Sequence, residues 1–257
     1  MKKILTIALC SLFLFACDKK EQNNSVDDSF TKILDKKEFV MGLDDSFPPM
    51  GFRNKSNEIV GFDIDLAKEV TKRLNISLKL QPISWDAKEQ ELNTGKIDCI
   101  WNGLSVDSSR IKAFNLSKPY LKNRMVFVVK NKSLTMESLN TKKIAVQNGS
   151  TAQKILEASE YGKAAAEIIP FDDNLTAMLD LEHGGVDFVF LDEVVAEYLI
   201  QSGNKPFVIM EEGLNEEEYA IGFRKKDEAL KNAIDSILTL MKNDGSFATI
   251  SEKWFGK

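Results

Sequence analysis

The sequence predicts an α/β protein built of mostly parallel sheets flanked by helices. Short apolar segments typical of strands, such as Glu38–Leu43, alternate along the chain with amphipathic segments such as Asp63–Leu74. Strands that alternate with helices favour parallel sheets, because a parallel crossover needs a connecting helix. The composition, 43% hydrophobic and 28% charged, is that of an ordinary globular protein. The length of 257 residues accommodates one large domain or two small ones.

The predicted strands are apolar runs bounded by polar or turn-forming residues. In chain order they are Glu38–Leu43, Ile76–Leu80, Ile97–Trp101, Val126–Val129, Lys143–Val146, Glu167–Ile169 and Val186–Phe190.

The predicted helices carry apolar residues at helical spacing. Asp63–Leu74 places Ile64, Ala67, Val70 and Leu74 on one face. A further helix is expected near Arg110, just after the strand Ile97–Trp101. The remaining helices are Ala87–Asn93, Ala152–Ser159, Leu175–His183, Val194–Gln201 and Glu228–Lys242, the last with Leu230, Ile234, Ile237 and Met241 on one stripe.

The first residues indicate export. Met1–Lys3 form a positive head, Ile4–Ala16 is almost uninterruptedly apolar, and Cys17 is followed at once by charged residues. This is the pattern of a secretory signal, and its apolar run is too short for a permanent membrane span. Leu14–Cys17 resembles the bacterial lipobox, in which the cysteine becomes the acylated first residue. The alternative is an ordinary secretion signal with an incidental cysteine.

We therefore expect residues 1–17 to be a lipoprotein signal peptide with lipidation at Cys17. Residues 18–33 begin with a polar run that lacks apolar periodicity, so they are expected to form a flexible tether.

Charge and cysteine content exclude several classes of function. The chain has 34 basic and 39 acidic residues, a net charge of -5, which is unlike a nucleic-acid binder. Of the three cysteines, Cys10 leaves with the signal and Cys17 is lipidated, so Cys99 has no disulfide partner and is expected to be a small buried hydrophobe. No residues have the spacing of metal ligands, so neither a metal nor a cofactor is expected.

Seven motifs run in order through the mature chain. They are Asp44–Met50, Gly61–Ala67, Leu92–Asp98, Trp101–Ser105 with Arg110, Phe114–Tyr120, Val146–Thr151 and Val186–Asp192. In this order and spacing the chain resembles the family 3 extracellular solute-binding proteins, which serve polar amino-acid importers of the ATP-binding-cassette (ABC) type. The resemblance covers nearly all of the mature chain.

The resemblance implies the two-lobed type II periplasmic-binding-protein fold. Each lobe is a mostly parallel sheet flanked by helices, two crossover strands form the hinge, and the ligand lies between the lobes. The crossovers are expected at Tyr120–Val128 and near Glu211–Phe223. Lobe 1 then comprises residues 34–121 plus 216–257, and lobe 2 comprises residues 122–215.

A free amino acid needs partners for its carboxylate and its ammonium group, because unpaired buried charges are costly. A guanidinium matches a carboxylate with two parallel hydrogen bonds. By resemblance, Arg110 binds the carboxylate with the backbone and hydroxyl of Ser105, and Thr151 adds a donor from lobe 2 at a helix N-terminus. The alternative for Arg110 is a solvated surface residue.

By the same resemblance, Asp192 accepts the ligand ammonium group. Its alternative is an N-cap for the helix that starts near Val194, and the two roles are compatible. Gly103 offers a backbone carbonyl to the ammonium where a side chain would obstruct.

The family places Asp44, Phe47 and Trp85 around the ligand side chain. Ordinary core packing is the alternative for the two aromatic residues. The sequence leaves open whether Asn102 and Gln147 face the pocket. Asp45 is more typical of an exposed turn.

Other polar residues are expected to be structural. Asp63 is expected to cap the helix that follows it, and Asp65 to be structural as well. His183 is expected at the end of a helix, where a cation is favourable.

The expected function is that of the extracytoplasmic substrate-binding component of an ABC importer. It delivers a polar L-amino acid (glutamine, a basic amino acid or a cystine-like ligand) to permease subunits, and it is expected to be a monomer anchored on the periplasmic side of the inner membrane or the outer face of a single membrane. One alternative is an enzyme resembling cyclohexadienyl dehydratase, for which Glu193 is a conceivable acid. The other is the ligand-sensing domain of a receptor. We expect no enzymatic activity.

Overall fold

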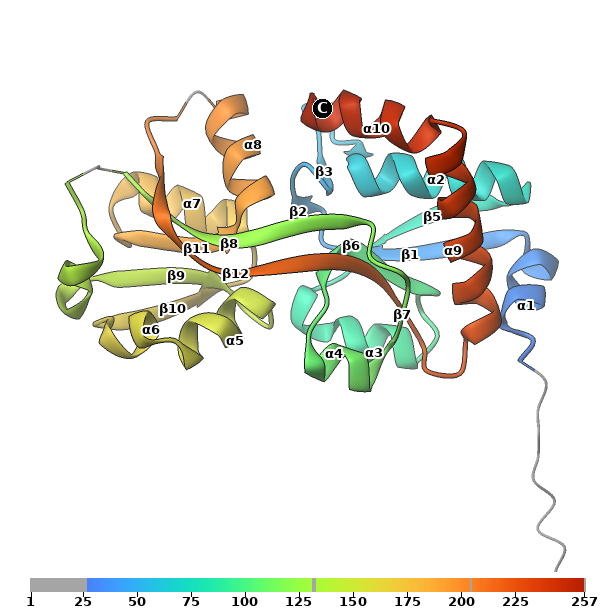
Figure 1. The fold of residues 1–257 in the computed structure, drawn as a ribbon, viewed down its shortest axis with the longest axis horizontal. Coiled ribbons are helices and arrows are strands. Elements are labelled where there is room, and N and C mark those ends of the chain that lie inside the picture. The colour runs from blue at the N-terminus through green and yellow to red at the C-terminus, as the bar shows by residue number, and fades with distance from the viewer. Residues whose placement is uncertain (1–26, 131–132, 204, 257) are drawn as a thin grey trace, which may run out of the picture.

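The structure, a computed structural model, describes residues 27–130, 133–203 and 205–256. The predicted signal peptide, Cys17 and the first part of the predicted tether lie outside the described residues. The chain forms two α/β lobes that lie side by side and are joined by two long strands (Figure 1). The predicted fold class is therefore confirmed.

The first lobe is built on three parallel strands. They are β1 (Glu38–Leu43), β5 (Ser77–Pro82) and β6 (Cys99–Ser105), with β1 in the middle. Nearly all of β1 is buried, as expected for a parallel strand that is covered on both faces. Cys99, at the start of β6, is fully buried and unpaired, as predicted.

Helices cover both faces of this sheet. One face packs on α1 (Ser29–Lys36), α2 (Phe62–Leu74), α9 (Glu228–Asn243) and α10 (Ser246–Phe255). The other face packs on the 3₁₀ turn η1 (Trp85–Ala87), α3 (Lys88–Asn93) and α4 (Ser108–Ala113). The apolar stripes predicted for α2 and α9 point into the core, with Leu74 only partly buried.

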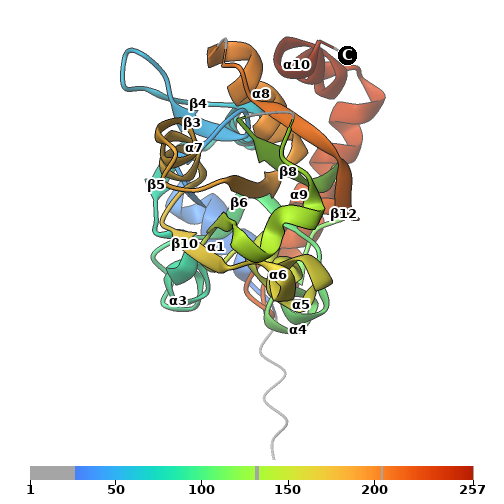
Figure 2. The same ribbon diagram turned by 90° about the vertical axis from the view of Figure 1, so that its left-hand side faces the viewer.

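The second lobe repeats the arrangement. Its parallel strands are β9 (Lys143–Gln147), β10 (Glu167–Phe171) and β11 (Phe188–Asp192). Figure 2, which faces this lobe, shows the strands between α7 (Asn174–His183) and α8 (Glu193–Gly203) on one side and α5 (Thr151–Ala158) and α6 (Glu160–Ala164) on the other. The short 3₁₀ segment η2 (Met136–Thr141) packs with α6. His183 lies in the last turn of α7, as predicted, and the left-handed Gly184 ends that helix.

Two antiparallel strands connect the lobes. These are β8 (Leu121–Val129) and β12 (Val208–Phe223), which pair from Val208 with Val129 to Tyr219 with Leu121. Because β8 also pairs with β11, and β12 with β6, the strands of both lobes form one continuous sheet. The short β7 (Asn115–Leu116) pairs with β12.

A small antiparallel sheet lies beside α2. It consists of β2 (Ser46–Phe47), β3 (Gly51–Arg53) and β4 (Ile59–Val60).

The structure corrects the predicted extent of the tether. Residues 29–36 form α1, whose Phe30 and Ile33 pack into the core of the first lobe. The Ser29 hydroxyl also accepts a hydrogen bond from the Leu230 N–H, at the start of α9, at 3.1 Å. This helix is hard to predict from the sequence, because polar residues precede Ser29 and the apolar face of the helix is only two turns long.

Candidate ligand-binding site

A small, tightly closed cavity lies between the two lobes. Every residue predicted to contact a ligand lines it, and so do Met125 and Ser150, which were not predicted. The lining residues are Asp44, Phe47, Trp85, Asn102, Gly103, Ser105, Arg110, Met125, Gln147, Ser150, Thr151 and Asp192. Asp45 does not line the cavity, because its carboxylate pairs with Arg53 at 2.6 Å.

The sheet topology explains why these residues meet. Asp44 directly follows β1, whereas Ser105, Gln147 and Asp192 are the last residues of β6, β9 and β11. The carboxyl ends of parallel strands form the binding edge of an α/β sheet. Here two such edges, one in each lobe, face each other across the cavity.

Arg110 is a buried cation at this edge. Its side chain is carried by α4, and only 4% of the residue is exposed. Nη1 donates a 2.8 Å hydrogen bond to the Ser105 carbonyl, and Nε lies 3.7 Å from Asp107 Oδ2 without a hydrogen-bond partner among the described residues. Burial lowers the pKa of the guanidinium, but arginine stays charged in proteins. The alternative of a solvated surface arginine is therefore wrong.

The N-terminus of α5 lines the cavity in the second lobe. The Ser150 hydroxyl caps the helix by accepting a 3.0 Å hydrogen bond from the Gln153 N–H. Thr151 is the first residue of the helix, and its hydroxyl lies 3.5 Å from Asp107 Oδ2 in the first lobe. A helix N-terminus favours an anion, because its first N–H groups have no partner within the helix.

Asp192 is a buried acid in the second lobe. Oδ1 accepts hydrogen bonds from Asn123 Nδ2, at 2.8 Å, and from the Tyr219 hydroxyl. Burial and the nearby charge of Glu217 raise the pKa of its carboxyl well above the usual value. No hydrogen bond joins this side chain to α8, so the structure gives no support for an N-cap. Asp192 also ends β11 itself, instead of following it as predicted.

Glu217 was not predicted to contribute. It lies on β12, and its Oε1 accepts hydrogen bonds from Ser105 Oγ at 2.9 Å and Asn123 Nδ2 at 2.7 Å. Burial raises the pKa of its carboxyl. From the sequence alone, the run Glu216–Glu218 would be predicted to be a solvated acidic patch. Only the alternation of side chains along the strand decides which of the three points inward.

Asp44 is the buried acid of the first lobe. Oδ1 accepts from the Ser46 N–H at 2.8 Å, and Oδ2 accepts from Gln147 Nε2 at 2.7 Å across the cleft. Burial raises the pKa of the carboxyl to about 6. Among the described residues, no lysine or arginine forms an ion pair with it. Asn102 Oδ1 accepts from the Asp44 N–H at 3.1 Å, while Asn102 Nδ2 is buried without a partner.

Gly103 lies where no side chain fits. Its φ is +57°, and a Cβ there would lie 2.7 Å from Phe47 Cε1. Phe47 and Trp85 line the cavity and also pack into the core.

Asp63 differs from its predicted role. The N-cap of α2 is Gly61, with no side-chain capping bond. Asp63 is instead fully buried beneath the binding edge, and its Oδ2 accepts from the Gly103 N–H and the Tyr120 hydroxyl, both at 2.9 Å. Burial raises the pKa of its carboxyl to about 7. Asp65 has the structural role predicted for it, accepting from Trp254 Nε1 at 2.8 Å.

Several contacts hold the lobes together around the cavity. Besides Asp44 and Gln147, the buried Lys88 ammonium of the first lobe donates to the Trp85 carbonyl at 2.8 Å and to the Gly149 carbonyl of the second lobe at 2.9 Å. At the rim, Phe52 packs on Tyr198 with ring centroids 5.3 Å apart. The structure is therefore a closed form. Lys88 was not predicted, since a lysine in an amphipathic helix is normally solvated.

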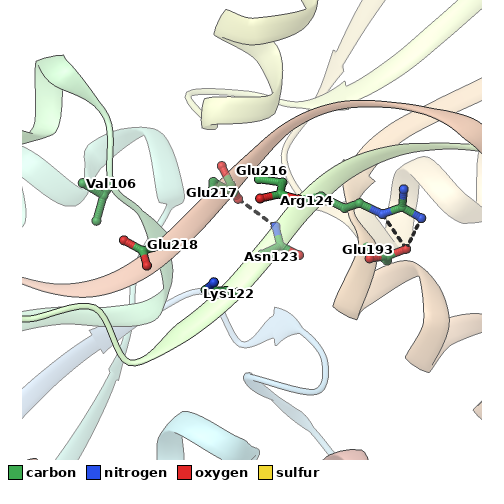
Figure 3. Close-up of a pocket in the computed structure, with 8 residues that line it drawn as sticks. All are labelled: Val106, Lys122, Asn123, Arg124, Glu193, Glu216, Glu217 and Glu218. Carbon is green, nitrogen blue, oxygen red and sulfur yellow. Dashed lines mark hydrogen bonds and ion pairs between the residues drawn. The ribbon is translucent and has the colours of Figure 1, made fainter.

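A second hollow lies outside the cleft, beside the hinge strands (Figure 3). It is an open groove, and Arg124 and Glu193 form an ion pair in it at 2.6 Å. Figure 3 shows Glu217 reaching Asn123 from this side. The lining residues are Val106, Lys122, Asn123, Arg124, Glu193, Glu216, Glu217 and Glu218.

Within residues 27–130, 133–203 and 205–256, no three acidic, histidine or cysteine side chains are grouped as metal ligands would be. No helix in these same ranges has the length and apolarity needed to cross a membrane.

Two α/β lobes on a paired-strand hinge, closed over a small polar cleft, define a solute-binding protein. The chain belongs to the bacterial extracellular solute-binding proteins, family 3, whose family model matches residues 39–257.

The curated relatives include two binding proteins of Escherichia coli K12. The chain is 27% identical to the L-cystine-binding protein TcyJ over 229 residues, which is 88% of this chain and 85% of the relative. It is also 27% identical to ABC transporter arginine-binding protein 1 over 261 residues, 99% of each chain.

Solved structures show the same likeness. An ABC uptake transporter substrate-binding protein from Streptococcus pneumoniae with bound histidine is 34% identical, with a TM-score of 0.85, over 91% of this chain and 98% of that one. An ancestral amino acid-binding protein, described as a precursor of cyclohexadienyl dehydratase, is 30% identical, with a TM-score of 0.81, over 88% and 99% of the two chains.

Proposed function

We propose that this protein is the extracytoplasmic substrate-binding component of an ABC importer, which captures a polar L-amino acid between its lobes and delivers it to a membrane permease. The observation that carries the proposal is the pair of opposite charges in the cleft. Arg110 comes from the first lobe and Asp192 from the second, and both line the same small cavity. One zwitterionic ligand bridging them favours the closed form, because only that form offers both contacts.

The carboxylate half of the site consists of Arg110 and the N-terminus of α5. The Ser105 carbonyl orients the guanidinium, whose remaining donors suit a planar carboxylate. Thr151 and its N–H add donors from the second lobe. The ligand carboxylate thus supplies the anion that the buried Arg110 guanidinium needs.

The ammonium half consists of Asp192, the Gly103 carbonyl and the Ser105 hydroxyl. Because the Ser105 hydroxyl donates its proton to Glu217, its oxygen is left as an acceptor. This revises the expected role of that hydroxyl, since an acceptor suits the ligand ammonium and not its carboxylate.

The part of the cleft that surrounds the ligand side chain favours a cationic amino acid. Asp44 is a buried carboxylate without a basic partner among the described residues, and a cationic ligand side chain would supply one. Phe47 and Trp85 offer apolar faces to the stem of such a side chain, with Asn102 and Gln147 as further polar contacts. Of the three ligand classes left open by the sequence, we favour basic amino acids over glutamine and cystine.

The site is proposed to bind without catalysis. Glu193, the conceivable acid of a dehydratase, does not line the cavity and is paired with Arg124. The family and its periplasmic relatives support an extracytoplasmic location. We further propose that Cys17 carries the lipid anchor and that the protein works as a monomer with its permease.

Thermal unfolding tests this function. A soluble fragment (residues 18–257) is refolded to remove any bound ligand and heated with each standard L-amino acid, cystine and ornithine. A ligand at ~100 times its Kd adds about 2.7 kcal/mol to the free energy of unfolding. We expect arginine, lysine, ornithine or histidine to raise Tm most.

Two variants and a control sharpen the test. Arg110→Ala should abolish the rise in Tm for every ligand, whereas Arg124→Ala, which removes an arginine outside the cleft, should retain it. Asp44→Asn should weaken basic ligands more than glutamine. If no amino acid raises Tm of the wild type, the proposed function is wrong; if glutamine or cystine raises it most, only the preference for basic ligands is wrong.

A further inference from the structure

Glu217 touches the binding site from the hinge. Its carboxyl lies on β12, the connecting strand. Through Oε1 it accepts hydrogen bonds from Ser105 at the end of β6 and from Asn123 on β8. One carboxylate oxygen therefore joins the first lobe to both hinge strands.

Asn123 extends this network to the second lobe. The same Nδ2 atom that donates to Glu217 at 2.7 Å also donates to Asp192 Oδ1 at 2.8 Å. Because both acids accept from one nitrogen, their carboxyl groups lie close together. Asn123 is buried, with 7% of its surface exposed.

We propose that Glu217 is a positioning residue of the ammonium half of the cleft. It holds the Ser105 hydroxyl and the Asn123 amide beside Asp192 and adds a second negative charge, so that the ligand ammonium is recognised by a pair of carboxyl groups. The inference rests on the proposed function, because it assumes that an ammonium group binds at Asp192.

The charges around Asp192 and Glu217 decide how firmly this pair of carboxyl groups holds a proton. On the buried side, the pair faces Arg110 and the Tyr219 hydroxyl. On the groove side lie Lys122, Glu216, Glu218 and the Arg124–Glu193 ion pair, all at the hinge surface. Two acids this close, one buried and one half-buried, retain a proton more readily than either alone. Burial raises the pKa of both carboxyls, and the charge of Glu217 raises that of Asp192 further, whereas the contact with Asp192 lowers that of Glu217.

Binding of an ammonium group should therefore release a proton from the pair. The added positive charge favours the doubly ionised form. The affinity of the wild type should rise with pH across the range in which the free pair loses its proton, since less proton has to be displaced at the higher pH. Lys88 and Arg110 are unchanged in all the variants compared below, so their charges are the same in each comparison.

Glu217→Gln removes the second charge and keeps the shape and the acceptor oxygen. Glu218→Gln is the matched control, because it makes the same charge change on the same strand at an exposed position that forms none of the network's hydrogen bonds. The probe is the amino acid that raises Tm of the wild type most in the screen above. Its Kd is measured by calorimetry at several pH values, in buffers of different ionisation enthalpy, which gives the number of protons released.

We expect Glu217→Gln to raise Kd about 10-fold near pH 7 and to come closer to the wild type as the pH falls and the wild-type pair takes up its proton. Proton release should be lost in this variant and kept in Glu218→Gln. Failure of the wild type to bind any amino acid overturns the proposed function. If the wild type binds but Glu217→Gln keeps its Kd, its pH profile and its proton release, the role of Glu217 is overturned. A uniform loss of affinity at every pH with unchanged proton release also overturns it, since that result would reflect packing alone.

Discussion

Lys88→Met should weaken ligand binding by opening the closed form. Lys88 is 8% exposed, and its ammonium has no carboxylate partner among the described residues. It donates to Trp85 within its own lobe and to Gly149 in the other. Only the second hydrogen bond depends on closure, so its loss is what changes the balance between the open and closed forms. Methionine keeps the length and apolarity of the side chain.

The expected size follows from these contacts. A hydrogen bond from a charged group contributes about 1.5–3 kcal/mol. Part of this is offset, because the variant no longer buries an ammonium on closing. A net change of about 1–2 kcal/mol corresponds to a Kd raised about 5- to 30-fold. We expect the change mostly in the rate of ligand dissociation, because closure retains the ligand after it has bound.

Lys154→Met is the control for this prediction. Lys154 also crosses the cleft, donating to Ser109 Oγ at 2.8 Å, but its side chain is 54% exposed. Exposed ion pairs contribute about 0–1 kcal/mol, so Kd should change less than about 5-fold. Calorimetry gives the Kd and stopped-flow fluorescence the rates. Equal effects of the two substitutions, or a Lys88→Met protein with wild-type Kd and dissociation rate, would refute the reasoning.

Lys88 also predicts a pH dependence at the alkaline end. Burial lowers the pKa of its ammonium to about 7 in the closed form, whereas an exposed lysine keeps the ordinary value of about 10.4. Closing therefore releases a proton between these two values, and the closed form gains stability over the open form as pH rises. Lys88→Met should remove this gain, so the ratio of its Kd to that of the wild type should increase as pH rises above about pH 7.

Two further predictions concern the floor of the cleft. Gly103→Ala should lower Tm and abolish the ligand-induced rise in Tm, because a Cβ would lie 2.7 Å from Phe47 Cε1 at a φ of +57°; a variant that binds like the wild type would contradict this. Asp63→Asn should change how stability depends on pH. The pKa of Asp63 is raised in the folded protein to about 7, so its contribution is fully present below about pH 4 and is lost as pH rises through 7. Chemical denaturation should show the wild type losing free energy of unfolding relative to the variant over this interval, and a constant difference would be evidence against the assignment.

Much of the fold could be predicted from the sequence, because apolar periodicity reports directly on burial. The helices α2 and α9 and the strand β1 were located to within about two residues. The short helix α1 and the small sheet β2–β3–β4 were missed, since elements of two to eight residues show too little periodicity to separate them from polar loops.

In the candidate site, too, some residues could be predicted from the sequence and others could not. Residues carried by the motifs, such as Arg110 and Asp192, line the cleft as expected. Lys88, Asn123 and Glu217 were not found, because nothing in their local sequence distinguishes a buried polar side chain from a solvated one. Their roles come from partners 61 to 112 residues away along the chain. Asp63 was misassigned for the same reason, since a helix cap is a local property and its actual partners, Gly103 and Tyr120, are distant in sequence.

The paired hinge strands have a mechanical consequence. β8 and β12 pair from one lobe to the other, with register shifts between Ile209 and Gly213 and between Leu214 and Glu216, so neither strand can slide along its neighbour without breaking the ladder. A two-stranded ribbon can still change its twist over a wide range. Relative motion of the lobes is thereby reduced to essentially one torsional coordinate. Every opening should return the two binding edges along the same path, with their residues in the same register.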